Sequence, residues 1–401
     1  MNIAFFTDTY VPTPDGVATF ASSLARALSR QGHSVRVCTT NPVKGAPPES
    51  TVIEGIPVLR ARSVPIPIYN EYRWALYPFW QVRAAHVGDW ADVIHLHTPG
   101  MVGWTGFVTG RRHHKPVVGT FHTNVWEARQ AFPKLPGVQL AFRGTWWFVR
   151  GLYWRCTATT APTVAARDYL LGASTKPYAR PMEVIPNGID IDRFHPGVTK
   201  PDWRARCGLP DGPLVTYLGR ITADKGVHRF LDTVTELMRQ RDLVAIVGGA
   251  GLDEEAVARR CRDDPILRTR ARFVGRVHEE EKAALLSQSD LFVLPSTSDT
   301  SSIAVLEALA CGVPVVVSDV GGAGELVEEG VVGRRAPILE PGGLTRTVGD
   351  LLADPARLNR MRGAAVAYVD RRGSIDVTAR RFIRLYESVL AEGPGPAARV
   401  A

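Results

Sequence analysis

The chain has 401 residues, of which 45% are hydrophobic and 22% charged; this composition is typical of a globular protein with about two domains and a large core. Its five cysteines are scattered and never spaced as CxxC, which argues against a disulfide framework or a zinc site. No apolar run approaches the ~18 residues of a membrane-spanning helix, and the start MNIAFFTDTY does not resemble a secretory signal, so we expect a cytoplasmic protein.

The net charge of +8 is concentrated in the first half of the chain. Residues 1–190 contain 19 basic and 11 acidic side chains, whereas residues 191–401 contain 29 of each. Residues 101–155 contain eight basic residues and a single acid, Glu127, and five of the nine tryptophans also lie there. A basic, tryptophan-rich surface suits an anionic membrane face or a polyanion. Because no recognised nucleic-acid-binding module is present, we do not expect a nucleic-acid partner.

Short β-branched runs alternate with longer helical patterns, which is typical of βαβ units around parallel sheets. In the first half, strands are predicted at 2–6, 35–39, 93–97, 117–121 and 184–186, and helices at 17–30 and 146–155. In the second half, strands are predicted at 214–218, 243–247, 272–274, 291–294 and 315–317. The pattern predicts an α/β chain with two Rossmann-like domains.

The domain boundary is predicted within 190–203, where prolines and a glycine interrupt the pattern. We therefore expect an N-terminal domain over 1–192 and a C-terminal domain over 193–375. A final helix over 376–391 has no strand after it and is expected to cross back to the first domain. Residues 392–401 are expected to be disordered.

Two cations follow the first strand of the second half, in "VTYLGRITADKG". Arg220 stands at the carboxyl end of the strand, and Lys225 precedes the next helix. Ligands of open α/β sheets bind beyond the carboxyl ends of the strands, so this pair suits a diphosphate. Solvated loop charges are the alternative interpretation of these two residues.

The stretch "SDTSSIAVLEALACGVPVVVSD" places Glu307 inside an apolar helix, with Asp299 eight residues before it. A carboxylate in an apolar interior requires a partner, so Glu307 must face a polyol, a cation or water. The helix begins near Ile303, and its free N–H groups and dipole favour an anion. Nothing in the periodicity places Asp299 and Glu307 side by side.

These segments resemble glycosyltransferase family 4, a group of retaining, nucleotide-sugar-dependent enzymes with the GT-B fold. The resemblance extends over more than 300 residues and includes, in order, the segments "MNIAFFTDTYVPTPDGVATF", "VIHLHTP", "GTFHTN", "VIPNGIDIDRF", "LGRITADKG", "FVGRV" and "LEALACGVPVVVSDVGGAGELV". It implies two Rossmann-like domains facing across a cleft, with the acceptor bound by the first domain and the nucleotide sugar by the second.

The resemblance also implies roles for particular residues. Arg220 and Lys225 match a diphosphate clamp, Glu307 a ligand of the ribose hydroxyls, and Asp299 an acid near the donor sugar, although the family usually has glutamate there. The other implied donor contacts are Gly16 under the phosphates, His122 beside the sugar, amides of Ser302 and Ile303 at phosphate, and Arg276 with Val277 at the base. No metal or other cofactor is implied.

The implied reaction is retaining transfer of a hexose from a nucleoside diphosphate, with UDP favoured over GDP-mannose, to a hydroxyl acceptor. The N-terminal segment looks most like lipid glycosyltransferases, such as diacylglycerol glucosyltransferases and phosphatidylinositol mannosyltransferases, which implies a membrane glycerolipid. Trp146, Trp147 and Arg150 are the candidate acceptor or membrane contacts, and a buried helix with solvated arginines is their alternative interpretation. Such contacts would make the protein peripheral at the cytoplasmic membrane face.

Three other functions fit parts of the pattern. A soluble glycosyltransferase acting on a small molecule would share every donor residue, and a non-catalytic nucleotide-sugar-binding protein would tolerate the altered acid Asp299. A two-domain dehydrogenase is disfavoured because no complete GxGxxG follows a strand; "AIVGGAGLDEE" matches that fingerprint only in part.

Overall fold

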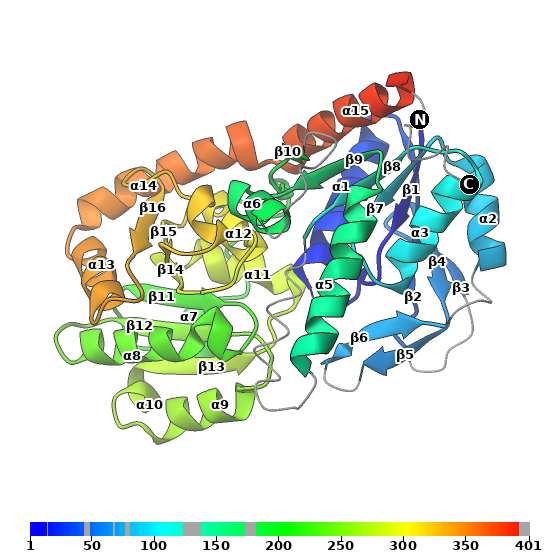
Figure 1. Ribbon diagram of the computed structural model, residues 1–401. Helices are drawn as coiled ribbons and strands as arrows, with labels where there is room; N and C mark the ends of the chain where they lie inside the picture. The colour runs from blue at the N-terminus through cyan, green and yellow to red at the C-terminus, as the bar shows by residue number, and fades with distance from the viewer. Residues whose placement is uncertain are drawn as a thin grey trace. The chain divides into compact units, whose positions relative to one another are not determined.

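The chain folds into two compact units. The computed structural model describes residues 1–13, 15–43, 49–66, 69–76, 81–122, 138–172 and 182–392 (Figure 1). Unit 1 comprises Met1–Gly188 and Ile375–Ala401, and unit 2 comprises Ile189–Ser374. The boundary predicted after residue 192 therefore lies inside unit 2. The tail predicted over 392–401 lies outside the described residues except for Glu392, which ends a helix.

Unit 1 is built on an eight-stranded sheet and a separate hairpin, with helices around them. Its strands are β1 (Asn2–Phe6), β2 (Ser34–Thr40), β3 (Glu49–Ile53), β4 (Ile56–Ala61), β5 (Ser63–Ile66), β6 (Tyr69–Ala75), β7 (Val93–Leu96), β8 (Val117–Thr120), β9 (Ala158–Ala161) and β10 (Met182–Val184). Its helices are α1 (Gly16–Arg30), α2 (Gln81–Trp90), α3 (Met101–Arg112), α5 (Val138–Trp154), α6 (Val164–Gly172) and α15 (Ile375–Glu392).

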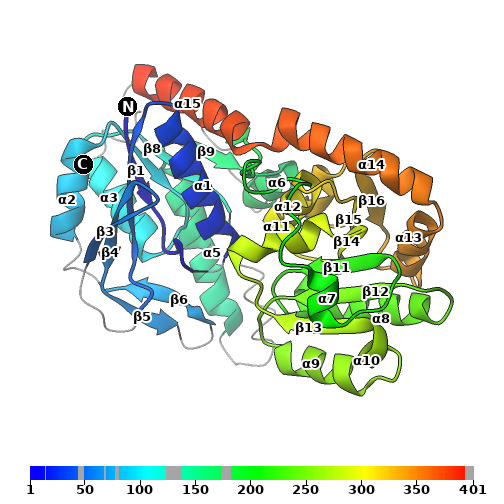
Figure 2. The same cartoon turned by 180° about the vertical axis from the view of Figure 1, so that it is seen from behind.

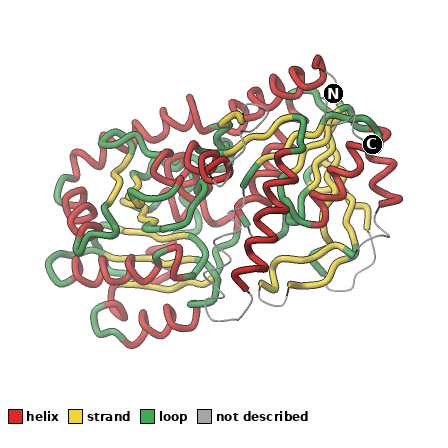
Figure 3. The backbone as a smooth tube through the Cα atoms, in the orientation of Figure 1, coloured by secondary structure: helices red, strands yellow, loops and turns green. Residues whose placement is uncertain are grey.

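The large sheet of unit 1 has the order β10-β9-β8-β7-β1-β2-β4-β3, and only β3 runs antiparallel to its neighbour. β7 and β8 are buried at every position, which is expected of parallel strands with both faces covered. β5 and β6 pair with each other in a two-stranded hairpin, visible as separate yellow strands in Figure 3. α15 packs along α1, and Arg30 Nη2 lies 2.9 Å from Asp376 Oδ1 across this contact.

Unit 2 has a six-stranded sheet. Its strands are β11 (Leu214–Leu218), β12 (Val244–Gly248), β13 (Ala271–Gly275), β14 (Leu291–Leu294), β15 (Val315–Ser318) and β16 (Gly333–Ala336). Its helices are α7 (Trp203–Cys207), α8 (Val227–Met238), α9 (Glu254–Asp263), α10 (Leu267–Arg270), α11 (Glu279–Ser287), α12 (Ile303–Ala310), α13 (Gly343–Leu352) and α14 (Pro355–Tyr368). Short 3₁₀ segments η1 (Ala223–Lys225) and η2 (Gly322–Leu326) and a π-helical turn η3 (Val369–Gly373) complete it.

The sheet of unit 2 is entirely parallel, in the order β13-β12-β11-β14-β15-β16 (Figure 2). The strand order reverses at β11, because the chain moves outward to β12 and β13 and then returns to β14 on the other side. Ligands of doubly wound sheets bind at such a switch point, beyond the carboxyl ends of the strands. The loops after β11 and β14 are therefore the expected place for a ligand in this unit.

Both predicted Rossmann-like sheets are confirmed, with differences at the edges. The strand predicted at 184–186 lies two residues earlier, and the helix predicted at 146–155 begins at Val138. β3, β4, β5, β6, β9 and β16 were not predicted. In the edge hairpin β3–β4, no position of β3 is buried, and the first positions of β4 alternate between buried and exposed. β5 contains Pro65, so neither hairpin resembles a buried parallel strand.

Candidate functional site

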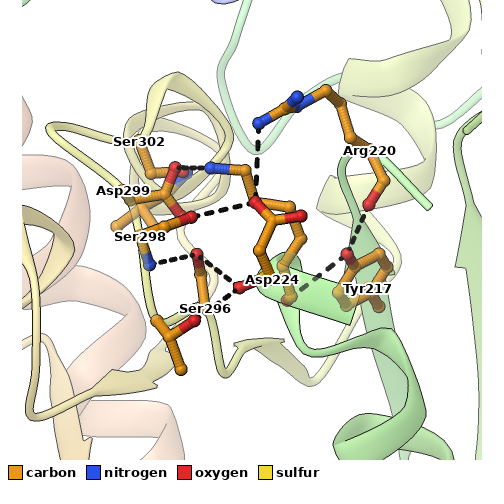
Figure 4. A network of polar contacts seen from close by, with 10 residues as sticks. Tyr217, Arg220, Asp224, Ser296, Ser298, Asp299 and Ser302 are labelled. Carbon is orange, nitrogen blue, oxygen red and sulfur yellow. Dashed lines mark hydrogen bonds and ion pairs between the residues drawn. The ribbon is translucent and has the colours of Figure 1, made fainter. Parts of the chain in front are cut away.

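The loop after β11 holds two cations, each opposite an acid (Figure 4). Arg220 Nη2 lies 3.6 Å from Asp224 Oδ2, and Lys225 Nζ donates a 2.8 Å hydrogen bond to Asp299 Oδ1. Burial alone would raise the pKa of Asp224, but Thr222, Lys225 and Arg220 lower it below its ordinary value. Both cations are thus paired with acids of the protein itself.

The backbone of this loop is anchored from both sides. The buried Tyr217 hydroxyl donates to the carbonyl of Arg220 at 2.8 Å, and the carbonyl of Asp224 accepts from the N–H of Thr297 at 2.9 Å. Ser298 Oγ donates to Asp224 Oδ2 at 2.9 Å, so the ends of β11 and β14 are joined by side chains as well. Gly226 has φ +75°, and a side chain there would collide with the carbonyl of the residue that follows β14.

The helix α12 begins beside these cations. Ser302 is its N-cap, and its hydroxyl accepts from the N–H of Val305 at 3.4 Å. Asp299, the partner of Lys225, precedes this cap by three residues, and Figure 4 shows the two side chains close together. Helix N-termini favour anions through their free N–H groups and dipole. Two cations and a helix amino end thus meet at the predicted switch point.

Glu307 has a partner within the protein. It lies on the second turn of α12 with 2% of its side chain exposed, and its Oε1 accepts from Lys282 Nζ at 3.4 Å. Burial raises the pKa of Glu307, and Lys282 opposes that rise. Burial alone would lower the pKa of Lys282, but Glu307 and Glu279 raise it above its ordinary value. Of the three partners expected for Glu307, a polyol, a cation or water, the structure itself supplies a cation, Lys282.

Unit 1 has its own polar site where β1 ends. Asp8 accepts hydrogen bonds from the N–H of Val102 at 2.9 Å and from Thr98 Oγ1 at 2.5 Å. Val102 lies in the first turn of α3, whose N-cap Gly100 has no side chain to offer. A Cβ atom at Gly100 would come within 2.5 Å of Asp8 Oδ2, so glycine leaves room for the carboxylate. Asp8 therefore occupies the amino end of α3.

Three buried histidines lie at the ends of β7 and β8. The rings of His95 and His97 are 4.1 Å apart, and His97 stacks on His122 at 5.8 Å with an angle of 14°. His95 lies 2.7 Å from both Tyr386 Oη and Thr120 Oγ1. Burial lowers the pKa of His122 to about 3, and it lowers the pKa values of His95 and His97 well below their ordinary value. All three rings are therefore neutral at pH 7.

The other predicted donor residues lie in both units. Gly16 is the exposed first residue of α1 in unit 1. Arg276 is exposed and Val277 buried just after β13 in unit 2, and Ile303 is the buried first residue of α12. Arg220, Lys225 and Asp299 are therefore brought together with Ser302 and Ile303, whereas Gly16 and His122 belong to the other unit.

The predicted contact residues of α5 separate into two groups. Trp147 is 75% exposed and Arg150 half-buried, and Phe148 next to Trp147 is also exposed. Trp146 instead packs against Tyr169, with ring centroids 4.9 Å apart, and belongs to a core cluster of unit 1. Trp146 is thus only partly exposed, and its role as an acceptor or membrane contact stays a prediction.

Sequence reasoning missed Lys282, Asp224 and Tyr217. Lys282 is 25 residues from Glu307, and no local pattern joins them. Tyr217 looks like an ordinary strand residue in "VTYLG", and only its buried hydroxyl distinguishes it. Asp224 could have been noticed, because it directly precedes Lys225.

No metal site or membrane-spanning helix was found in the part of the chain that the structure describes. Its histidine, cysteine and acidic side chains nowhere form a group of three or more that could hold a metal ion. None of the helices searched there is both long and apolar enough to cross a membrane.

Comparisons with known proteins agree with this arrangement. The model of Glycosyltransferase Family 4 matches residues 14–193, and that of Glycosyl transferases group 1 matches residues 212–354. A GDP-mannose-dependent alpha-mannosyltransferase of Mycolicibacterium smegmatis is 30% identical over 82% of this chain and 82% of its own length. The alpha-monoglucosyldiacylglycerol synthase of Streptococcus pneumoniae is 29% identical over 79% of this chain and 70% of its own.

Solved structures show the same fold at lower identity. The sucrose-phosphate synthase of Thermosynechococcus elongatus superposes with a TM-score of 0.79 at 20% identity, covering 98% of this chain and 100% of its own. Similarity at that identity shows the GT-B architecture of two parallel-sheet domains and nothing about substrates. Together with the matched relatives it establishes what kind of enzyme this is: the chain belongs to glycosyltransferase family 4 and is a hexosyltransferase with the GT-B fold.

Proposed function

We propose that this hexosyltransferase transfers a hexose from a nucleoside diphosphate to a hydroxyl group of a membrane glycerolipid, with retention at the anomeric carbon. The anion site of unit 2 is the observation that carries the proposal. There, Arg220 and Lys225 lie beside the amino end of α12. A diphosphate brings two negatively charged groups, which matches two cations and a helix N-terminus.

The proposed reaction is a front-face displacement. The bond between the anomeric carbon and the diphosphate oxygen breaks, and the acceptor oxygen bonds to the same face of that carbon. The hydroxyl proton passes to the departing phosphate oxygen. Arg220 and Lys225 stabilise the charge that develops on the diphosphate, and donors already in place cost no reorganisation at that moment. We propose no metal for this step, because the two cations supply the positive charge.

The remaining roles are proposed on the resemblance of the motifs. Glu307 binds the ribose hydroxyls, and Arg276 with Val277 borders the base. Asp299 has two tasks in this proposal. Its Oδ1 holds Lys225, while its Oδ2, which is buried and has no hydrogen-bond partner among the described residues, is free to accept from a sugar hydroxyl.

Two residues of unit 1 are proposed as donor contacts on the resemblance of their motifs alone. His122 is assigned to the sugar, and Gly16 to the phosphates. Because burial keeps the pKa of His122 at about 3, its ring is neutral and interacts with sugar hydroxyls by hydrogen bonding alone.

For the donor we propose UDP-hexose, with GDP-mannose as the second candidate. The name of the Mycolicibacterium smegmatis relative favours the second. Thermal unfolding of the full chain with UDP-glucose, UDP-galactose, UDP-N-acetylglucosamine and GDP-mannose tests both. A donor present at 100 times its dissociation constant adds about 2.7 kcal/mol to the unfolding free energy. If none of the four stabilises the chain, the anion site does not serve a nucleotide sugar.

The lipid acceptor is proposed from two observations. The streptococcal relative is named for a diacylglycerol product, and α5 exposes Trp147 and Phe148 next to Arg143 and Arg150. Tryptophan and arginine suit the membrane interface, where the ring meets acyl chains and the guanidinium meets lipid phosphate. We propose that this face of α5, named here the α5 face, contacts an anionic membrane peripherally.

Vesicle co-sedimentation tests the α5 face. We expect the chain to bind vesicles of phosphatidylglycerol and phosphatidylcholine at low salt, and to bind less as salt screens the charges. The double variant Trp147→Ser/Phe148→Ser should lose most of this binding. Leu339→Ser, which removes an exposed apolar side chain of unit 2, is the matched control and should not. Transfer to a water-soluble acceptor without vesicle binding would favour a soluble acceptor instead.

A further inference from the structure

Lys282 has no part in the resemblance, yet it contacts the residue on which the nucleotide assignment depends. It lies on the first turn of α11, and its Nζ reaches Glu307 Oε1 on α12. The same ammonium group contacts Glu279, one turn earlier on α11. α11 starts two residues after Val277, so the helix that carries Lys282 directly follows the proposed base contact in the chain.

Because Glu307 is buried, its ionisation depends on its contact with Lys282. Glu307 is almost fully buried, whereas 22% of the Lys282 side chain remains exposed. A buried carboxylate without a partner takes up a proton instead of staying charged. Lys282 is the nearest cation to Glu307, and Arg193 lies farther out and is held by Glu279 at 3.7 Å. The charge on Glu307 therefore depends mainly on Lys282.

We propose that Lys282 is a positioning residue for the nucleotide: it keeps Glu307 ionised and turned so that one carboxylate oxygen bonds the lysine and the other accepts from ribose hydroxyls. The inference rests on the proposed function, in which Glu307 binds ribose. Oε1 accepts from Lys282, so Oε2 is the oxygen that we assign to the ribose hydroxyls. An ionised acceptor forms stronger hydrogen bonds with hydroxyls than a protonated one.

A purely structural ion pair makes a different prediction. If Lys282 only stabilised the packing of α11 on α12, removing it would lower stability and weaken every nucleotide equally. If it positions Glu307, its removal weakens nucleotides with a ribose 2′-hydroxyl more than nucleotides without one. The loss must also depend on pH, because an unpaired Glu307 protonates more readily. Lys282, Glu279 and Arg193 are the charged groups around Glu307 that set this titration.

Calorimetric titration of the full chain tests this with UDP, GDP and their 2′-deoxy counterparts, at about pH 8 and about pH 6. We expect the wild-type chain to prefer the ribonucleotide at both pH values. Lys282→Met should reduce that preference about tenfold at the lower pH, and less at the higher one. Lys282→Arg should retain it, because a guanidinium also pairs with a carboxylate. Lys200→Met removes an exposed lysine of the same unit and is the matched control.

Each outcome decides the matter. A ribose preference that stays at the wild-type value in Lys282→Met at both pH values overturns the proposal. A wild-type chain that binds the nucleotides without ribose preference removes the ribose role of Glu307, and the inference with it. A wild-type chain that binds neither nucleotide contradicts the proposed function itself. If Lys282→Met does not fold, Lys282→Gln keeps a donor without the charge and is compared in the same way.

Discussion

One helix in each unit begins at the carboxyl edge of the sheet, and the groups that cap the two amino ends differ in charge. In unit 1, the amino end of α3 is filled by the carboxylate of Asp8, because the N-cap Gly100 has no side chain. In unit 2, the amino end of α12 is capped by the neutral hydroxyl of Ser302, with Lys225 nearby. The amino end of α3 already holds a carboxylate of the protein, whereas the amino end of α12 has a neutral cap and suits an anion from outside.

The candidate side chains of the two units also differ in charge. Unit 1 contributes neutral imidazoles, since burial lowers the pKa values of His95, His97 and His122. Unit 2 contributes Arg220 and Lys225, which are paired with Asp224 and Asp299. We therefore expect affinity for a diphosphate to reside in unit 2, and charge changes in unit 1 to act on stability instead.

Lys225→Ala should have the largest effect. Removing one preorganised donor from a developing charge typically costs about 3 kcal/mol, or 10² to 10³ in rate. We expect turnover with the preferred donor to fall by at least that factor while the fold is retained. Because the variant leaves Asp299 without its partner, Lys225→Ala/Asp299→Asn should accompany it, with Lys200→Ala as a surface control. Near-normal turnover in the double variant would remove Lys225 from the clamp.

Asp8→Ala should act on stability alone. The substitution leaves the N–H of Val102 and the hydroxyl of Thr98 without their acceptor, and loss of such a cap costs about 2 kcal/mol at most. We expect the unfolding free energy to fall by about that amount in a denaturant titration, with nucleotide affinity unchanged. A nucleotide affinity that fell with stability intact would place Asp8 in the ligand site.

The strands and the position of the two cations after β11 were predictable because their signals are local. Buried strands such as β1 and β11 read as continuous apolar runs, and their predicted bounds are those observed. Arg220 and Lys225 follow a strand directly, so topology alone places them at the carboxyl edge of the sheet. The hairpins β3–β4 and β5–β6 were missed because they are partly exposed and one contains a proline.

The partners of the site residues were not predictable, because they come from distant segments. Asp299 was expected near a sugar, yet it is bonded to Lys225, 74 residues away. Glu307 was recognised as a residue that needs a partner, but the partner Lys282 lies on a different helix. Pairing of this kind depends on how helices pack, and the periodicity of one segment does not encode it.

Acid should destabilise the fold through the neutral histidines. A histidine whose folded pKa lies below its unfolded value binds fewer protons when folded, so its contribution to stability is present above about pH 6.5 and is lost as the pH falls. With the folded pKa at about 3, lowering the pH from about 7.5 to about 5.5 should cost about 1.4 kcal/mol for His122 alone. The measurement is the denaturant-unfolding free energy at the two pH values. His122→Asn should reduce this pH dependence, and the exposed His114→Asn should leave it as it is.

Ser302→Asp tests the comparison between the two helices directly, because it gives α12 the carboxylate that α3 already has. Aspartate and serine cap helices about equally well, so the unfolding free energy should change by less than ~0.5 kcal/mol. A negative charge at a helix amino end is worth about 1 kcal/mol, so placing it there in advance should weaken UDP and GDP binding about fivefold. Ser302→Asn provides the control, since asparagine caps without a charge and should keep the affinity. If the Asp variant binds UDP and GDP as tightly as the wild-type chain, the amino end of α12 is not where the diphosphate binds.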